Sequence, residues 1–176
     1  WRKEGNRQPA ALHVDTGMNR LGLDAADLDP AAFRNLQIDL LMSHFAASEV
    51  PDDPANARQI AAFAAAAQRF PDTPKSLLNS SGHFLADAPA YDITRPGYAL
   101  YGGNPTPGKP NPMKPVIGLE ARIVQLREVE DGTKVGYNGT WTARGRRKLA
   151  TICLGYADGY PRNASANDHQ GGGSAL

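Results

Sequence analysis

The sequence lacks several features that would place it in a particular class of protein. It contains one cysteine, Cys153, so no disulfide forms within the chain, and a reducing, cytoplasmic location is expected. No stretch reaches the roughly 20 consecutive apolar residues of a membrane-spanning helix, and no secretory signal peptide is visible. The formal net charge is +1, which gives no electrostatic reason to expect a nucleic acid or an anionic membrane as partner.

Smaller absences lead to further expectations. No histidine or acidic cluster accompanies Cys153, so we expect no metal site, and its apolar neighbours at 149–154 predict a small buried side chain. The basic cluster at 144–148 is short and contains a glycine, which favours a solvated hairpin tip over a nucleic-acid patch. The chain begins at Trp1 without an initiator methionine and ends in a glycine-rich stretch at 171–174, so we expect an incomplete piece of a longer protein.

Short apolar runs alternate with helical patterns along the first part of the chain. A helix is expected at 30–36, because Asp29 is a typical N-cap and Pro30 suits the first helical position. A longer helix is expected at 54–70, where apolar residues recur at helical spacing until Pro71. Strands that alternate with helices indicate an α/β fold with a parallel sheet. The apolar runs that predict these strands are 10–14, 38–45, 76–78 and 91–94.

A different pattern follows a proline-rich segment at 104–115, which cannot be helix or central strand. Apolar and polar residues alternate from 117 to 128, and Asp131-Gly132 is a tight-turn signal. Further strands are expected at 134–137 and 149–154, so this part is predicted to be antiparallel β structure. The expected division is into two partial domains, 1–112 and 113–176.

Polar side chains follow the expected parallel strands, where α/β folds place their chemistry. His44 can titrate near neutrality, and Arg95 offers planar donors with a permanent charge. Ser80 precedes a possible short helix at 81–85, whose free N–H groups would bind an anion. Taken singly, each residue also fits an ordinary role, as a hydrogen-bonded strand-end histidine, a surface ion pair or a helix cap.

Six motifs taken together change that weighing. They are DTGMNRLGL (15–23), LMSHFA (41–46), LLNSSG (77–82), TRPGYALYG (94–102), VGYNGTW (135–141) and LGYADGYPR (154–162). In their order, and over most of the chain, they resemble alanine racemase, a fold-type III enzyme that uses pyridoxal 5′-phosphate. The resemblance implies the later part of a (β/α)₈ barrel of the TIM type, followed by the start of an all-β domain.

The resemblance also implies cofactor-binding roles for residues of the barrel part. Ser80, with Asn79 beside it, would bind the phosphate through its hydroxyl and N–H, and Gly97 and Tyr98 would add backbone N–H donors. Arg95 would face the pyridine nitrogen and keep it unprotonated. That weakens the ring as an electron sink and favours racemisation over side reactions.

Further roles concern the substrate. Tyr137 matches the tyrosine that acts on one face of the substrate Cα, and His44 would bridge it to Arg95. A free tyrosine has a pKa of about 10, and a cationic neighbourhood of His44 and Arg95 would lower the pKa of Tyr137. Arg20 would hold the substrate carboxylate. The residues near the entrance would be Tyr156 and Arg162.

The chain departs from the family pattern in places. No lysine here stands in a context that matches the family's cofactor lysine, and a substrate-side methionine and a later entrance tyrosine also have no counterpart. The chain alone is therefore expected to be inactive and to form no covalent link to the cofactor. His13 stands where many members carry a lysine that becomes carbamylated and orients the loop arginine. Another anion would then support Arg20, or Arg20 would be held more loosely.

The function implied by the resemblance is the interconversion of L- and D-alanine with one base on each face of Cα. The complete enzyme would be a homodimer with shared active sites, and D-alanine would supply bacterial peptidoglycan. Two alternatives stay open. One is a racemase of serine or of several amino acids, because the substrate pocket lies partly outside the chain. The other is a non-catalytic pyridoxal-phosphate-binding barrel protein, although such proteins generally lack a β-domain.

Overall fold

The computed structural model describes residues 8–164, 167–169 and 171. The chain divides into two compact units, Trp1–Ile117 and Gly118–Leu176. Trp1 itself and the end of the glycine-rich stretch, 172–174, lie outside the described residues. Within the described ranges, no helix is long and apolar enough to cross a membrane.

The first unit contains a four-stranded sheet with the strand order β2-β1-β3-β4. Neighbouring strands are all parallel, and the register places Leu12 opposite Leu41 and Met42 opposite Ser76. The parallel α/β sheet predicted from the sequence is therefore confirmed. The strands are β1 (Ala10–Asp15), β2 (Leu23–Asp24), β3 (Ile38–Met42) and β4 (Lys75–Ser76).

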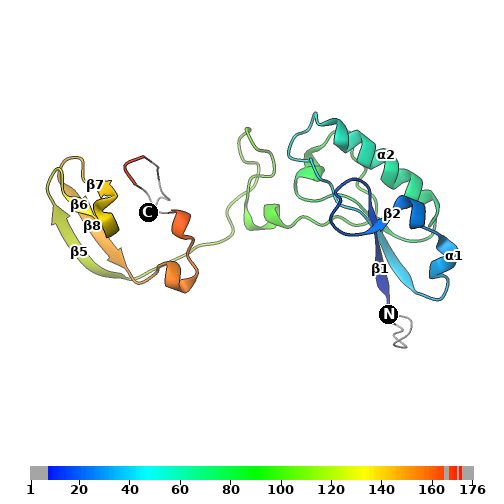
Figure 1. Ribbon diagram of the computed structural model, residues 1–176, viewed down its shortest axis with the longest axis horizontal. Coiled ribbons are helices and arrows are strands. Elements are labelled where there is room, and N and C mark those ends of the chain that lie inside the picture. The colour runs from blue at the N-terminus through cyan, green and yellow to red at the C-terminus, as the bar shows by residue number, and fades with distance from the viewer. Residues whose placement is uncertain (1–7, 165–166, 170, 172–176) are drawn as a thin grey trace. The chain divides into compact units, whose positions relative to one another are not determined.

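Two α-helices of this unit begin where the sequence predicts. In α1 (Pro30–Phe33) the Asp29 carboxylate accepts the N–H of Ala31 at 2.9 Å, and in α2 (Pro54–Gln68) the Asp53 carboxylate accepts that of Ala55 at 2.8 Å. Each helix has proline at its start, as its missing N–H allows. α1 is shorter than expected, because the chain turns after Phe33 toward β3 (Figure 1). The short 3₁₀ helices of this unit are η2 (Ala25–Asp27), η3 (Ser81–Phe84) and η4 (Tyr98–Tyr101).

The core of the first unit lies between α2 and the sheet. Phe63 of α2 is fully buried, and its ring meets that of Tyr91 edge-on with the centroids 5.2 Å apart. Strand residues Val14 and Leu41 are also fully buried. The buried cluster comprises Leu12, Val14, Leu28, Leu41, Phe45, Phe63, Ala66, Ala67, Phe70, Leu77 and Leu78.

The strand expected at 91–94 does not form. Tyr91 has a φ of 53°, in the left-handed region, which interrupts an extended course. The N–H groups of Asp92 and Ile93 both donate to the single carbonyl of Lys75, at 3.2 and 3.1 Å, instead of forming a regular ladder. The segment therefore lies beside β4 as irregular chain and leads to Arg95.

The second unit is antiparallel β structure, as the sequence predicts. β5 (Ile123–Val129) pairs with β8 (Arg147–Ile152), and β6 (Lys134–Val135) pairs with β7 (Trp141–Thr142). Gly132, with a φ of 75°, lies in the turn between β5 and β6. Three 3₁₀ helices complete the described part of this unit: η5 (Tyr137–Gly139), η6 (Tyr156–Asp158) and η7 (Arg162–Ala164).

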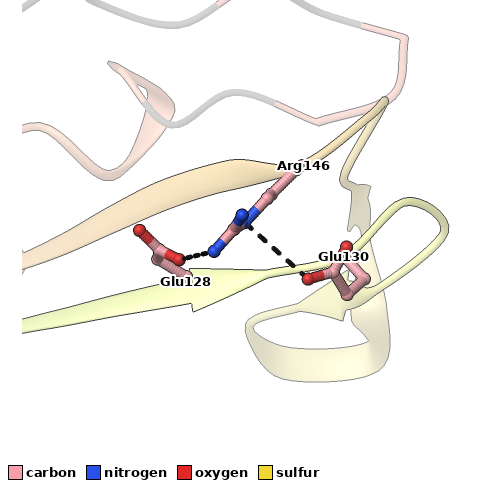
Figure 2. Close-up of polar contacts among 3 residues, drawn as sticks. All are labelled: Glu128, Glu130 and Arg146. Carbon is pink, nitrogen blue, oxygen red and sulfur yellow. Dashed lines mark hydrogen bonds and ion pairs between the residues drawn. The ribbon is translucent and has the colours of Figure 1, made fainter.

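The basic cluster at 144–148 lies at the connection from β7 to β8. Figure 2 shows the Arg146 guanidinium between two carboxylates, those of Glu128 and Glu130. All three side chains are at least half exposed, so the pairing contributes little to stability. Arg146 therefore links the chain just before β8 to the end of its antiparallel neighbour β5.

Cys153 corrects one expectation. Its side chain is exposed rather than buried. The sequence predicted burial from its apolar neighbours, but β5 and β8 form a two-stranded sheet whose residues are mostly exposed on both faces. The apolar run at 149–154 therefore does not bury Cys153.

Candidate functional site

The candidate site lies where the strands of the parallel sheet end. Because β1, β3 and β4 run parallel, the residues that follow them meet at one edge of the sheet. The hydroxyl groups of Thr16, after β1, and Ser43, after β3, lie 2.7 Å apart. The guanidinium of Arg95 donates to the Ser76 hydroxyl at the end of β4 and to the Ser43 carbonyl. One side chain from a later segment thus joins the ends of two strands.

Asp15 shapes the loop that carries Arg20. One oxygen of its carboxylate accepts the N–H groups of Gly17, Met18 and Asn19 at 2.8, 2.9 and 3.1 Å. These bonds, the one from Gly17 foremost, hold the pKa of the Asp15 carboxyl below its usual value. The loop reaches Arg20 as an exposed side chain.

Arg95 is a half-buried cation near the ends of β3 and β4. Burial lowers the pKa of its guanidinium, but arginine starts so high that the group stays charged at neutral pH. Among the described residues, no carboxylate forms an ion pair with it. A positive charge in this setting favours an anionic or electron-rich ligand.

His44 lies half-buried in the field of these arginines. Burial first, and then the charges of Arg95, Arg20 and His13, lower the pKa of its imidazole below 6.5. Burial and the arginines thus favour the neutral ring, whereas the sequence analysis expected a cationic neighbourhood of His44 and Arg95. His13 shows the same direction, since burial and Arg95 lower its pKa more than Asp15 raises it. The charge of this region rests on Arg95 and Arg20.

Gln59 of α2 joins the loop after β1 to the end of β3, a role that was not predicted from the sequence. Its side-chain amide donates to the Thr16 hydroxyl at 3.1 Å and to the His44 carbonyl at 2.9 Å, and it accepts the N–H of Ala46 at 2.8 Å. Gln59 is only 2% exposed and Ser43 only 1%. A sequence signal existed, because Gln59 stands four residues before Phe63 on the buried face of the helix.

Ser80 and the start of η4 form a cradle of polar groups. The Ser80 hydroxyl accepts the N–H groups of Gly97 and Ala99, both at 3.1 Å. Both N–H groups point to this one oxygen, so a hydroxyl and two backbone donors lie together, as in sites that bind a phosphate. The expected residues Ser80 and Gly97 are thus brought together, while Ala99 takes the position in this bonding that the sequence analysis gave to Tyr98.

Asn79 and Tyr98 have other surroundings. The Asn79 side chain accepts the Ser48 hydroxyl at 2.9 Å and the Gly82 N–H at 2.8 Å, so it stabilises the start of η3. The Tyr98 side chain is 63% exposed, and its ring packs so closely on Gly103 that an added Cβ there would lie 2.3 Å from it. Glycine at 103 therefore leaves room for this ring.

The remaining expected residues belong to the second unit. Tyr137 begins η5 rather than ending a strand, because Gly136 and Asn138 on either side have φ values of 79° and 59°. Its side chain is 86% exposed. The Arg162 guanidinium lies over the Tyr156 ring, 5.9 Å from its centroid, so these two form a cation–π pair.

Comparison with known proteins identifies close relatives. The family model described as alanine racemase, N-terminal domain, matches residues 1–105, and that of the C-terminal domain matches residues 116–173. Alanine racemase of Methylobacterium nodulans is 58% identical over 168 residues, and that of Methylobacterium sp. strain 4-46 is 54% identical over 168 residues. The first of these alignments covers 93% of this chain and 45% of that relative, and the second covers 93% and 46%.

A solved structure gives the same result. The crystal structure of alanine racemase from Bartonella henselae, described as having covalently bound pyridoxal phosphate, is 39% identical and superimposes with a TM-score of 0.74. The match covers 93% of this chain and 47% of that one. The chain therefore spans about half the length of the relatives it matches.

Proposed function

Because the chain belongs to the alanine racemase family, we propose that the protein carrying it interconverts L- and D-alanine with bound pyridoxal 5′-phosphate. The observation that carries this proposal is the pairing of a buried hydroxyl cradle with a cation that forms no ion pair among the described residues. Ser80 and two backbone N–H groups form the cradle, and Arg95 supplies the cation. Together they suit a phosphate at one end and a ring nitrogen at the other.

Several residues of the first unit would hold the cofactor. The Ser80 hydroxyl and the N–H groups of Gly97, Tyr98 and Ala99 would bind its phosphate, whose anionic oxygens would replace the Ser80 oxygen as acceptor of the Gly97 and Ala99 N–H groups. Arg95 would donate to the pyridine nitrogen and, because it stays protonated, would leave that nitrogen without a proton. When bound, the cofactor would stabilise negative charge at the substrate Cα. Asn79 would support the phosphate site indirectly, because its side-chain oxygen already accepts hydrogen bonds from Ser48 and Gly82.

Other residues would bind the substrate and move its proton. Arg20, on the loop shaped by Asp15, would bind the alanine carboxylate. Tyr137 would give or take the Cα proton on one face, and a lysine elsewhere in the full-length protein would serve the other face. A neutral His44 would link Arg95 to the Tyr137 phenol by hydrogen bonds. Tyr156 and Arg162 would line the entrance.

The complete protein is proposed to be a homodimer whose active sites are shared. In this arrangement Tyr137 would enter the site of the partner subunit, and the β-unit of one subunit would exclude water from the barrel of the other. We further propose a cytoplasmic location, consistent with the single cysteine, and a supply of D-alanine for peptidoglycan.

Arg95→Glu in the full-length protein tests the proposed role of Arg95. A carboxyl group there would allow the ring nitrogen to carry a proton, so racemisation should slow by roughly tenfold or more while transamination products accumulate. Turnover of L-alanine is followed by chiral chromatography of both enantiomers and assay of pyruvate. Arg69→Glu, which changes an exposed arginine just after α2, is the matched control. An unchanged racemisation rate with no new product would show that Arg95 is not the partner of the ring.

A further inference from the structure

Gln59 is a buried polar residue for which the proposed function gives no role. Its side chain is 2% exposed, and a buried amide is costly unless hydrogen bonds satisfy it. Both N–H groups and the carbonyl oxygen of this amide have partners, on Thr16, His44 and Ala46. An alanine-rich helix that only packed against the sheet could carry an apolar residue at this position.

The partners of Gln59 belong to the two segments that hold the proposed substrate residues. Thr16 is in the loop that ends at Arg20, and His44 follows β3. Because the Thr16 hydroxyl accepts a hydrogen from Gln59, its own proton is free to donate to the Ser43 hydroxyl 2.7 Å away. The Ser43 carbonyl in turn accepts from Arg95. Hydrogen bonds, continued through the covalent bonds of Ser43 itself, thus connect Gln59 to the proposed ring partner.

The packing of the loop agrees with this hydrogen bonding. Gly17 follows Thr16 and has a φ of 132°, a conformation that a residue with a Cβ rarely adopts. A Cβ built at Gly17 would lie 3.6 Å from the Cγ of Gln59, so the loop backbone passes directly over the glutamine side chain. The loop is therefore held from one side by Asp15 and from the other by Gln59.

We propose that Gln59 is a positioning residue that fixes the Arg20 loop relative to His44. The inference rests on the proposed racemase function, because it assigns Gln59 to the alignment of a substrate-binding loop with a proton-linked histidine. The hydrogen bonds of the Gln59 side chain go to Thr16 and to the backbone of His44 and Ala46, not to the Arg20 guanidinium or the His44 imidazole. Gln59 acts through Thr16 on one side and through the His44 backbone on the other.

Two substitutions in the full-length protein separate these sides. Thr16→Val keeps the side-chain volume but removes the loop-side partner, so KM for alanine should rise by roughly three- to tenfold while kcat changes by less than about twofold. Gln59→Leu removes the hydrogen bonds to Thr16 and to the His44 carbonyl together, so kcat should also fall by roughly 10- to 100-fold. Gln68→Leu, at the exposed end of the same helix, is the matched control and should leave both constants unchanged.

A purely structural role for Gln59 predicts a different outcome. The variants would then lose activity only in proportion to the unfolded fraction, which circular dichroism measures, and KM would stay at the wild-type value. If Gln59→Leu does not fold, Thr16→Val decides, and an unchanged KM in that folded variant overturns the proposal.

A second measurement does not depend on activity. Hydrogen exchange at the amides of Gly17, Met18 and Asn19 should be at least about fivefold faster in Thr16→Val and Gln59→Leu than in Gln68→Leu. Equal exchange in all three variants would overturn the positioning role even if the wild-type protein racemises alanine. If the wild-type protein does not racemise alanine but exchange is still faster in Thr16→Val and Gln59→Leu than in Gln68→Leu, the positioning role stands and the proposed function is refuted.

Discussion

At the scale of single residues, the sequence predicts which groups gather but not how they are charged. His44, Ser80 and Arg95 were expected at strand ends, since a strand that stops at a polar residue is a local pattern. The lowered pKa of His44 depends on burial and on Arg95, which is 51 positions away by the residue numbers. No local pattern reports such a neighbour. The helical spacing to Phe63 places Gln59 on the buried face of α2, but its three hydrogen-bond partners come from other segments and could not be predicted locally.

The lowered pKa of His44 predicts a pH dependence of stability. In the unfolded chain the imidazole recovers its ordinary pKa of 6.5, so below that pH the unfolded state binds more protons than the folded state. The contribution of His44 to the free energy of unfolding is therefore complete above pH 6.5 and is lost as the pH drops toward the folded-state pKa. His13 acts in the same direction.

Nuclear magnetic resonance titration and thermal unfolding of the full-length protein check this prediction. The ring signal of His44 should titrate with a midpoint below 6.5. His44→Gln should lose less melting temperature than the wild type between about pH 7.5 and about pH 5.5. His83→Gln, at an exposed histidine, provides the control and should behave as the wild type. A His44 midpoint above 6.5 would contradict the burial argument.

At the scale of elements, what is encoded locally was predicted and what depends on pairing was not. The starts of α1 and α2 follow from an aspartate and a proline, whose effects act within one helical turn. The apolar run at 91–94 resembled a strand, but the conformation of Tyr91 and the shared carbonyl of Lys75 prevent a ladder. In the second unit the alternation predicted strands correctly, yet it also predicted a buried Cys153 that is exposed.

The N-cap of α2 gives a prediction at this scale. Asp53→Ala removes the acceptor of the Ala55 N–H, which should destabilise the helix by about 1 kcal/mol. Because α2 carries Gln59, hydrogen exchange measured by mass spectrometry should become faster across residues 54–60 of the full-length protein. Asp52→Ala replaces the exposed neighbouring aspartate and should leave exchange unchanged. Equal effects of the two substitutions would mean that the cap contributes nothing to α2.

At the scale of the whole molecule, the proposed reaction needs residues from both units. Ser80, Arg95 and His44 belong to the first unit and Tyr137 to the second. The chain matches only 45% of the length of the Methylobacterium nodulans relative, so the proposed activity is that of a longer protein. The high exposure of Tyr137, 86%, is compatible with a side chain that a partner subunit would cover. The sequence order alone cannot indicate whether such a residue serves its own subunit or the partner.

Tyr137→Phe in the full-length protein tests the proposed proton transfer. The substitution should abolish proton exchange on one face of Cα and leave cofactor binding nearly intact, because the phosphate cradle lies in the other unit. Deuterium washout from each alanine enantiomer, followed by nuclear magnetic resonance, should persist for D-alanine only. Tyr160→Phe, in the same unit, is the control. Washout from both enantiomers in Tyr137→Phe would exclude this tyrosine as a base.

Hybrid dimers test whether the sites are shared. A subunit with Tyr137→Phe is mixed with a subunit that lacks the cofactor lysine. If each site takes its lysine from one subunit and Tyr137 from the other, both substitutions fall in the same site of the hybrid and the second site is intact. Up to about half of the activity should then return in each hybrid. Hybrids that form and stay inactive would show that Tyr137 serves its own subunit or takes no part.

The long-range hydrogen bonds of Arg95 and Gln59 also have a consequence for how quickly the site can assemble. Arg95 reaches back 52 residues to Ser43, and Gln59 reaches back 43 residues to Thr16. Closing such large loops costs chain entropy before any contact is gained. We therefore expect the sheet and α2 to form first and the bonds of the site to form after the rate-limiting barrier. Substitutions at these residues would then speed unfolding and leave the folding rate almost unchanged.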